Sequence, residues 1–105
     1  MERAEIRWFK FQRPDKKRPV LILTRSSALK FLNEATIAPI TSTIRNIPSE
    51  VLLDEYEGMK GLCAVNLDHI QTASKNKIGA RITVLSDEKM HEVKSALLFA
   101  LGFDD

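Results

Sequence analysis

The feature that most constrains this chain is an apolar run that follows a basic segment. Residues 18–24 read RPVLILT, and the positions from Val20 to Leu23 are all aliphatic. A run of this length without polar alternation is typical of a strand that is covered on both faces. Pro19 disfavours the helical region for the residue before it, so Arg18 is held extended where the strand begins. The fold must therefore bury this strand from two sides.

Most of the remaining chain also predicts short strands. The segments that read as strands are AEIRWFKF (4–11), TIAPIT (36–41), VLLDEY (51–56), LCAVNLDHIQT (62–72) and ARITVL (80–85), of which 62–72 is the longest. Residues 26–35 predict a turn or two of helix with Ser26 or Ser27 as the N-cap. Pro39 cannot donate to a strand ladder, so we expect it at an edge, an end or a bulge.

The last part of the chain predicts one amphipathic helix. Ser86 is a good N-cap, and Asp87 and Glu88 complement the positive end of the helix dipole. Gly102 stands where a glycine commonly ends a helix. One helical face carries Met90, Val93, Leu97 and Leu101. Several short strands followed by one helix indicate a single, mainly β domain over residues 1–105, a small and strongly bent sheet or barrel packed by the C-terminal helix.

The composition indicates a cellular compartment. The 105 residues include one cysteine, Cys63, which excludes an internal disulfide and suits a reducing cytosol. The N-terminal residues MERAEIRW are charged and lack the apolar core of an export signal. The longest apolar run, ALLFAL at 96–101, is too short to cross a bilayer. We therefore expect a cytoplasmic protein that does not contact membranes.

The positive charge is concentrated early in the chain. Residues 1–30, which include the polar loop QRPDKK at 12–17, hold nine Lys or Arg and three Asp or Glu. Residues 31–105 hold seven Lys or Arg and eleven Asp or Glu, so the net charge of the whole chain is only +2. The basic part is a candidate face for phosphates, unless folding mixes the charges again.

No metal or cofactor site is predicted. The soft ligands Cys63, His69 and His91 do not form a CxxC, HxxH or HExxH motif, and the chain has no glycine-rich phosphate loop and no GxSxG motif. The spacing of the two histidines does not indicate a shared catalytic site either.

One strand start carries groups that suit an anion. Arg18 lies next to Lys16 and Lys17, and its backbone is restricted by Pro19. A guanidinium on a fixed backbone is a ready partner for a phosphate. The alternative is a solvated basic turn in front of a buried strand.

One strand end carries three hydroxyl groups. In IAPITSTIR (37–45), the run Thr41-Ser42-Thr43 follows the apolar residues. Such hydroxyls can hold phosphate oxygens or a ribose hydroxyl. They can equally form a turn that leads into the next loop. Arg45, on that loop, is a candidate phosphate contact.

The segment 62–72 mixes polar and apolar residues. In one continuous strand Asn66 and Asp68 share a face, and His69 and Gln71 lie on the opposite face unless a bulge intervenes. These side chains either point to solvent or line a groove. Two roles are open for Asp68: it is a general base, or it holds Arg18 through a charge-assisted hydrogen bond.

At these residues the chain resembles the MazF/PemK (Kid) family of bacterial toxins. The resemblance rests on AEIRWFKF, KRPVLIL, IAPITSTIR, AVNLDHIQT and LSDEKMHEVKSALLFALG, in this order and over nearly the whole length. It implies a small SH3-like β-barrel with a C-terminal helix, usually a homodimer. It also implies an endoribonuclease that cuts single-stranded RNA at short sequences without a metal. The ribose 2′-hydroxyl then attacks its own phosphate and leaves a 2′,3′-cyclic phosphate and a 5′-hydroxyl.

The resemblance also implies partners and site residues. The expected protein partner is a cognate antitoxin whose acidic C-terminal segment wraps the dimer and covers the RNA site. Arg18 and Thr41 match the catalytic pair of the family, and Asp68 stands where some members place a general base. The candidate RNA contacts are Lys16, Lys17, Ser42, Thr43, Arg45, Asn66, His69 and Gln71. Asn66 and Gln71 replace arginines of the family pattern, so the cleavage sequence does not transfer.

Two alternative functions are open on the sequence alone. CcdB, a gyrase-poisoning toxin family with the same fold, acts through a tryptophan near its C-terminal end, whereas the only tryptophan here is Trp8. The second alternative is a module that binds RNA or a peptide without cutting it.

Overall fold

The computed structural model describes residues 1–11 and 16–103, so the predicted loop at 12–17 lies mostly outside the described residues. The strands are β1 (Glu5–Lys10), β2 (Lys17–Ile22), β3 (Glu34–Thr41), β4 (Glu50–Leu53), β5 (Cys63–Asn66), β6 (Gln71–Ser74) and β7 (Ile78–Val84). The helices are α1 (Ser26–Leu29) and α2 (Asp87–Leu101), and the 3-10 turns are η1 (Glu55–Glu57), η2 (Leu67–His69) and η3 (Lys75–Lys77).

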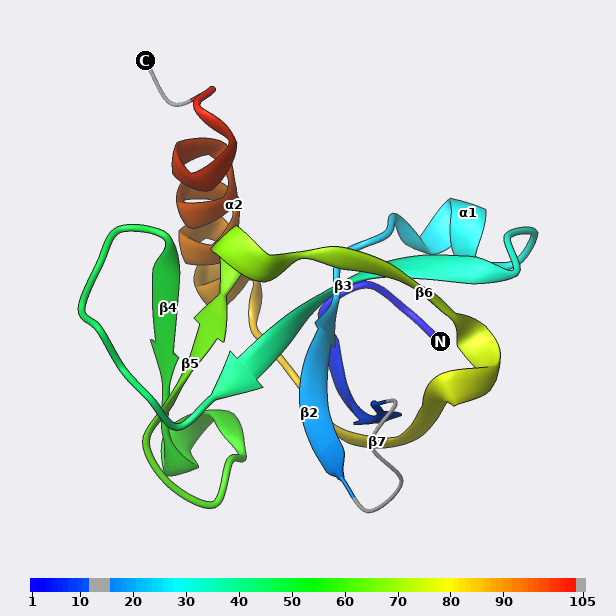
Figure 1. The fold of residues 1–105 in the computed structure, drawn as a ribbon, viewed down its shortest axis with the longest axis horizontal. Helices are drawn as coiled ribbons and strands as arrows, with labels where there is room; N and C mark the ends of the chain where they lie inside the picture. Colours follow the sequence, from blue (N-terminus) through cyan, green and yellow to red (C-terminus); the bar gives the residue numbers. More distant parts are fainter. Residues whose placement is uncertain (12–15, 104–105) are drawn as a thin grey trace.

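The strands form one antiparallel sheet that bends strongly. Their order is β4-β5-β3-β2-β1-β7, and β6 also pairs with β3. Figure 1 shows the bend, with α2 packed against the side of β4 and β5. Within the described residues the sheet does not close between β4 and β7. The predicted mainly β fold with a C-terminal helix is confirmed, and its barrel is an open one.

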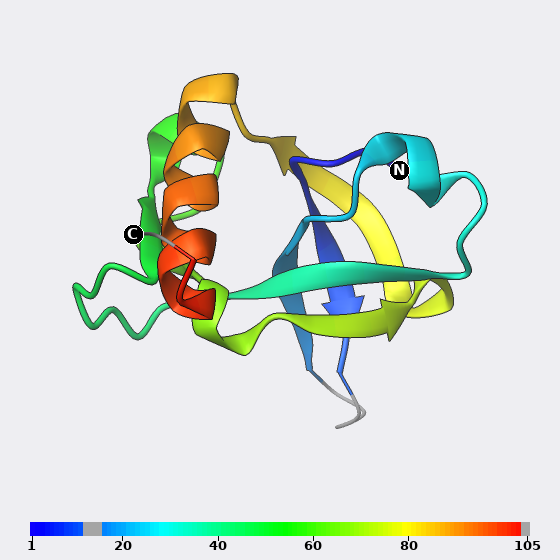
Figure 2. The same ribbon diagram turned by 90° about the horizontal axis from the view of Figure 1, so that it is seen from above.

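β2 lies in the middle of the sheet and is buried from both sides, as its sequence predicts. Val20, Leu21 and Ile22 have no exposed surface. Leu21 belongs to the core cluster that includes residues of α2, and Val20 and Ile22 belong to a second cluster that includes a residue of α1. Figure 2 shows the two helices at opposite ends of the molecule. Because successive side chains of a strand point to opposite faces, β2 contributes residues to both cores and lies between them.

β3 changes its partner along its length. Its first half pairs with β6, and its last two residues, Ile40 and Thr41, pair with β5. Within the described pairing, Pro39 lies in the gap between these two ladders and is opposite Val20 of β2. A residue that cannot donate a hydrogen bond is tolerated there, which fits the expected position at the end of a ladder.

The prediction of one long strand over 62–72 is wrong. The chain forms β5, then the turn η2, and then β6. The side-chain oxygen of Asn66 accepts a hydrogen bond from the Asp68 N–H at 3.0 Å. This local bond offers the backbone an alternative to the next ladder bond. The break lets the two halves of the segment pair with different parts of β3.

The expected N-cap of the short helix is also wrong. Arg25 is the N-cap of α1, and its side chain makes no capping hydrogen bond. The hydroxyl of Ser26 instead accepts a hydrogen bond from the Arg3 N–H at 2.9 Å. The Ser26 hydroxyl therefore binds the backbone of a residue that is distant in sequence and does not cap the first turn of α1.

α2 has the caps that its sequence predicts. The hydroxyl of Ser86 accepts a hydrogen bond from the Lys89 N–H at 3.1 Å, and Gly102 ends the helix in the left-handed region with φ of 80°. Val93 on the expected face is buried, but Leu101 at its far end is 52% exposed. None of the described helices is both long enough and apolar enough to cross a membrane.

Candidate functional site

Arg18 and Thr41 meet where two neighbouring strands begin and end. β2 and β3 are antiparallel, with Val20 opposite Pro39. Extending this register by two residues along each strand sets Arg18 opposite Thr41. The Arg18 side chain is exposed and Thr41 is half-buried. The sheet therefore brings together the two residues that the family resemblance pairs.

These two residues lie at the centre of a groove made of two hollows. Both hollows are lined by Lys16, Arg18, Ile40 and Thr41. The apolar hollow, of about 780 Å³, is completed by Trp8, Lys17, Pro19, Ser42, the segment 58–63 and Ile82. The polar hollow, of about 650 Å³, is completed by Phe11, Pro39, Thr43, Arg45, Glu50, Asn66 and His69. A chain that passes through both hollows crosses the Arg18–Thr41 pair.

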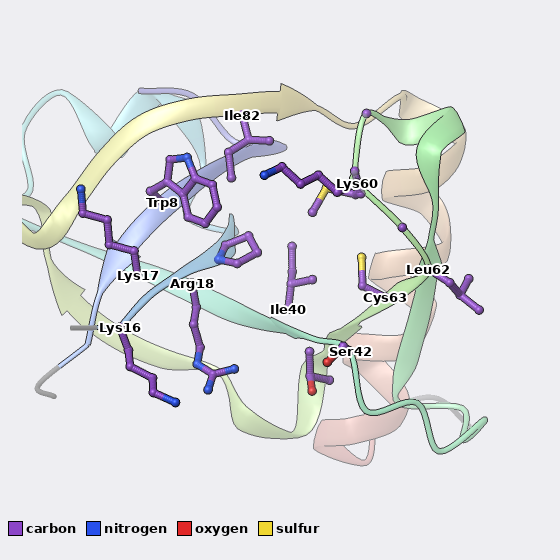
Figure 3. A pocket seen from close by; sticks show the side chains of 15 residues that line it. Trp8, Lys16, Lys17, Arg18, Ile40, Ser42, Lys60, Leu62, Cys63 and Ile82 are labelled. Atoms are coloured by element: carbon purple, nitrogen blue, oxygen red, sulfur yellow. The ribbon is translucent and has the colours of Figure 1, made fainter. Parts of the chain in front are cut away.

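The apolar hollow has a positive rim. Figure 3 shows Trp8, Ile82 and Ile40 around it, with Lys16, Lys17 and Arg18 on one side and Lys60 on another. None of the described residues that line this hollow carries a carboxylate. Four cations without a carboxylate raise the local positive potential, which favours a polyanion.

The Thr41 hydroxyl combines a turn role with a free donor. Its oxygen accepts a hydrogen bond from the Thr43 N–H at 3.0 Å. A hydroxyl has one donor and two acceptor lone pairs, so its proton remains available to a ligand in the groove. The two interpretations of this residue, turn formation and phosphate binding, are therefore compatible.

The polar hollow is ordered by side-chain hydrogen bonds. One oxygen of Glu50 accepts from the backbone N–H groups of Arg45 (3.0 Å) and Asn46 (3.1 Å), which fixes the loop after β3. The Asn66 amide lies 3.3 Å from Nδ1 of His69. The hollow thus presents an amide, an imidazole and a carboxylate, which are groups that can bind the edges of bases.

Two residues selected from the sequence do not line the groove. Oδ2 of Asp68 accepts a hydrogen bond from the Ser49 hydroxyl at 2.6 Å, and no ion pair joins Asp68 to Arg18 in the described part of the chain. Gln71 lies in β6, opposite Ile37, and lines neither hollow. The other nine selected residues line one hollow or both.

Sequence reasoning did not select Trp8, Lys60 or Glu50 as site residues. Trp8 lies on β1, opposite Pro19 of the next strand, and Lys60 follows the turn η1, so only Lys60 is distant in sequence from Arg18. The exposure of the Trp8 indole between the buried residues Ile6 and Phe9 is seen only in the structure, so the sequence offers no local signal for it. Lys60 lies between Gly58 and Gly61, which indicates a loop but no particular neighbour.

The site offers neither a reactive thiol nor a metal-binding cluster. Burial raises the pKa of the Cys63 thiol, and the nearby charges of Glu57 and Asp54 raise it further. The thiol is therefore protonated at neutral pH and is a poor nucleophile. Over residues 1–11 and 16–103, no three His, Cys, Asp or Glu side chains are grouped so that they could hold a metal ion.

Comparison with known proteins identifies the family. A profile described as a PemK-like, MazF-like toxin of type II toxin-antitoxin systems matches residues 2–101. The chain belongs to this family. It is similar to endoribonuclease MazF3 of Mycobacterium tuberculosis, with 41% identity over 90 residues that cover 86% of this chain and 87% of that protein. The resemblance to the MazF/PemK family is thus confirmed.

Solved structures of the family have the same fold. The Mycobacterium tuberculosis toxin MazF-mt6 superposes with a TM-score of 0.88 at 33% identity, and the match covers 96% of this chain and 99% of that one. A mycobacterial endoribonuclease in complex with its cognate antitoxin superposes with a TM-score of 0.87 at 24% identity, over 97% and 95% of the two chains. The second likeness is one of fold alone.

Proposed function

We propose that this chain is the toxin of a type II toxin–antitoxin pair and cuts single-stranded RNA at short sequences. The ribose 2′-hydroxyl next to the scissile phosphate is the nucleophile, and no metal takes part. The products are a 2′,3′-cyclic phosphate and a 5′-hydroxyl. Cutting messenger RNA in this way stops translation and growth.

The observation that carries this proposal is the position of Arg18 and Thr41. Both line the two hollows, so an RNA strand that fills the groove places a phosphate beside them. Lys16, Lys17 and Lys60 supply further positive charge along the apolar hollow. Contacts of this kind hold the backbone and position it without reading the sequence.

The chemistry follows from where charge develops. The bond from O2′ to phosphorus forms as the bond from phosphorus to O5′ breaks. The 2′-hydroxyl gives up one proton, and the departing O5′ takes one up, so the reaction consumes no co-reactant. Negative charge grows on the non-bridging oxygens, where the Arg18 guanidinium stabilises it and the Thr41 hydroxyl donates a hydrogen bond. A guanidinium combines positive charge with several N–H donors in a fixed plane, so it can take the place of a metal cation here.

The remaining selected residues divide by position. Ser42, Thr43 and Arg45 follow β3 and line the groove, where they contact the RNA backbone. Asn66 and His69 face the polar hollow and contact bases. Asp68 is bonded to Ser49, and we assign it the positioning role of holding η2 against the loop before β4. Its role as a general base remains a prediction.

Two partners follow from family membership. The toxin is expected as a homodimer, and a cognate antitoxin is expected to cover the groove with an acidic segment. The cationic rim of the apolar hollow supports the expected antitoxin contact, because an acidic segment, like RNA, carries the negative charge that the rim attracts.

The test uses purified protein, a long natural RNA and excess chelator, with cut sites mapped by primer extension. Discrete cuts whose downstream fragments carry a 5′-hydroxyl are expected. Arg18→Ala is expected to lower the rate by about 10²–10³ or more, because one oxyanion-stabilising donor is lost. The matched control is Arg25→Ala, which removes an exposed arginine outside the groove. Full activity of Arg18→Ala, or cuts that require added metal, would overturn the proposed mechanism.

A further inference from the structure

The apolar hollow contains an aromatic surface that the proposed chemistry does not use. Trp8 is 37% exposed, which is unusual for the largest side chain of a small domain. Figure 3 shows its indole near Ile82, with Ile40 farther across the hollow, whereas Leu62 on the far rim is directed away from the hollow. Pro19 is opposite Trp8 on the neighbouring strand. Trp8 therefore presents part of a flat ring to a space walled by aliphatic groups.

The two hollows differ in what they can recognise. The polar hollow contains an amide, an imidazole and a carboxylate from Asn66, His69 and Glu50. Among the described residues of the apolar hollow, the neutral polar groups are the hydroxyls of Thr41 and Ser42, at the end of β3, the thiol of Cys63 and the indole N–H of Trp8. Amide, imidazole and carboxylate groups are therefore found in the polar hollow, whereas the apolar hollow offers hydroxyls, a thiol, an indole N–H and cationic side chains.

We propose that the Trp8 hollow holds a nucleobase of a nucleotide that flanks the scissile phosphate, by stacking and without regard to its identity. The polar hollow then reads the sequence on the other side. This inference rests on the proposed function, because it assumes that RNA crosses the Arg18–Thr41 pair. It makes Trp8 a substrate-binding residue that affects the rate and leaves the cleavage sequence unchanged.

Charge and continuity favour RNA as the occupant. The hollow shares Arg18 and Thr41 with the polar hollow, so a backbone bound at Arg18 delivers its neighbouring base directly to Trp8. Lys17 and Lys60 lie on opposite sides of Trp8 and add positive charge on both flanks of the hollow. Every nucleobase has a face that stacks on an aromatic ring, so stacking tolerates any sequence.

The first test uses the fact that Trp8 is the only tryptophan of the chain. A cut site is mapped on a long RNA, and an oligonucleotide across it is made non-cleavable with a 2′-deoxy sugar at the cut nucleotide. Binding of this oligonucleotide is expected to quench the tryptophan emission. Inorganic polyphosphate, which has charge but no bases, is the control and is expected to compete for the groove without quenching. Equal quenching by both, or by neither, overturns the stacking proposal.

The second test removes bases one at a time. In wild-type protein, an abasic nucleotide at one position beside the cut is expected to lower kcat/KM about ten- to a hundredfold, the usual effect of losing one stacked base. In Trp8→Leu, which keeps an apolar side chain but has no ring face, the complete and abasic RNAs are expected to be cut at similar rates. Trp8→Phe is expected to restore most of the difference. Phe31→Ala, at an exposed phenylalanine outside the groove, is the matched control.

The outcomes separate this inference from the proposed function. If wild-type protein cuts no RNA, the proposed function fails and the inference fails with it. If wild-type protein cuts but Trp8→Leu keeps the same rate and the same dependence on bases, only the inference fails. If Trp8→Leu cuts normally but loses binding of an acidic antitoxin peptide, the hollow is a peptide site, which also overturns the inference. If Trp8→Leu does not fold, the emission of Trp8 in wild-type protein decides the matter: the abasic oligonucleotide at the critical position is expected to bind without quenching, and quenching equal to that of the complete oligonucleotide overturns the inference.

Discussion

At the scale of single residues, Thr41 connects the fold to the chemistry. Its oxygen holds the backbone of Thr43 while its proton is free to point into the groove. In the proposed mechanism this arrangement fixes the hydroxyl before RNA binds, so little reorganisation is needed in the transition state. The neighbouring hydroxyls of Ser42 and Thr43 are exposed and lack this constraint in the described hydrogen bonds.

Replacing the Thr41 hydroxyl should therefore separate catalysis from folding. Thr41→Val keeps the shape of the side chain, and we expect the cleavage rate to fall by about 10²–10³ because one donor to the phosphate is lost. The loss of one exposed turn hydrogen bond should cost only about 1 kcal/mol of unfolding free energy. Single-turnover cleavage and urea unfolding measure the two effects. Thr41→Ser is the control and should remain active, so a similar loss in both variants would contradict the role of the hydroxyl.

Sequence reasoning finds site residues when local backbone signals mark them. Arg18 is marked by the following proline and Thr41 by the end of an apolar run, and both do line the groove. The selection of Asp68 assumes one long strand over 62–72. The η2 turn breaks this strand, and the Asp68 carboxylate accepts a hydrogen bond from Ser49 and does not line the groove. Trp8 lines the groove through the pairing of β1 with β2, and Lys60 through the packing of a loop from a distant part of the chain, and no local pattern encodes either position.

At the scale of elements, the loop after η1 forms one wall of the apolar hollow, and Gly58 fixes its course. Gly58 has φ of 94°, and a Cβ there would lie 2.7 Å from the hydroxyl oxygen of Thr83 in β7. That hydroxyl donates to the Glu57 carbonyl at 3.0 Å. The loop is thus held against β7 at its start.

Gly58→Ala is expected to lower the unfolding free energy by more than about 1 kcal/mol, because the left-handed backbone and the contact with Thr83 both penalise a side chain. Gly61→Ala, in the same loop, is the matched control. A Cβ at Gly61 meets no described atom within 4 Å, so its effect should stay within about 0.5 kcal/mol. Chemical denaturation measures both values. Equal effects would show that Gly58 does not constrain the loop.

The junction of β1 and β7 contains a buried carboxylate. Glu5 is 6% exposed, and its Oε1 accepts from the Glu2 N–H (3.1 Å) and from Arg7 (2.7 Å). Burial acts to raise the pKa of Glu5, but the hydrogen bonds from Glu2 and Arg7 and the charge of Arg7 outweigh it, so the pKa lies below its ordinary value of 4.5.

The lowered pKa of Glu5 predicts a pH-dependent stability. The stabilisation is fully present above the ordinary pKa and is lost as the pH falls through the lower pKa of the folded state, because the unfolded chain takes up the proton first. Glu5→Gln should therefore be less stable than wild type at pH 7, and the difference should shrink below about pH 4. Urea midpoints across pH 3–7 test this. A difference that is constant across this range would contradict the ion pair as its source.

The strands that the sequence predicts well are those with a clear apolar pattern. β2 is recognised because its consecutive aliphatic residues predict burial, and Val20, Leu21 and Ile22 are indeed fully buried. α2 is recognised because the residues that cap it, Ser86 and Gly102, are adjacent to it in sequence. The break of segment 62–72 is missed because it depends on one Asn66 side chain and on β3 changing partners. Period-two alternation cannot reveal a turn that contains neither glycine nor proline.

At the scale of the whole molecule, the exposed apolar residues indicate where a second copy can bind. The end of α2 and the residue after its cap expose Phe99, Leu101 and Phe103, which lie within five residues of each other. Phe99 and Phe103 line one hollow beside Val51 and Ala96, and Leu101, two residues from Phe99, lies on another side of the helix. Exposed apolar side chains gathered at one end of a helix are a candidate interface. This interface lies at the opposite end of the molecule from α1, and its residues do not line the groove.

We therefore predict that Leu101→Glu dissociates the dimer, because a charge would be buried against an apolar partner surface. Sedimentation equilibrium should give twice the 11.9 kDa chain mass for wild type and the single mass for the variant. Phe31→Glu is the matched control, since Phe31 is 84% exposed but isolated from the end of α2 in sequence. Dissociation by Phe31→Glu instead would place the interface near α1. A wild-type protein of single mass at all concentrations would contradict the dimer itself.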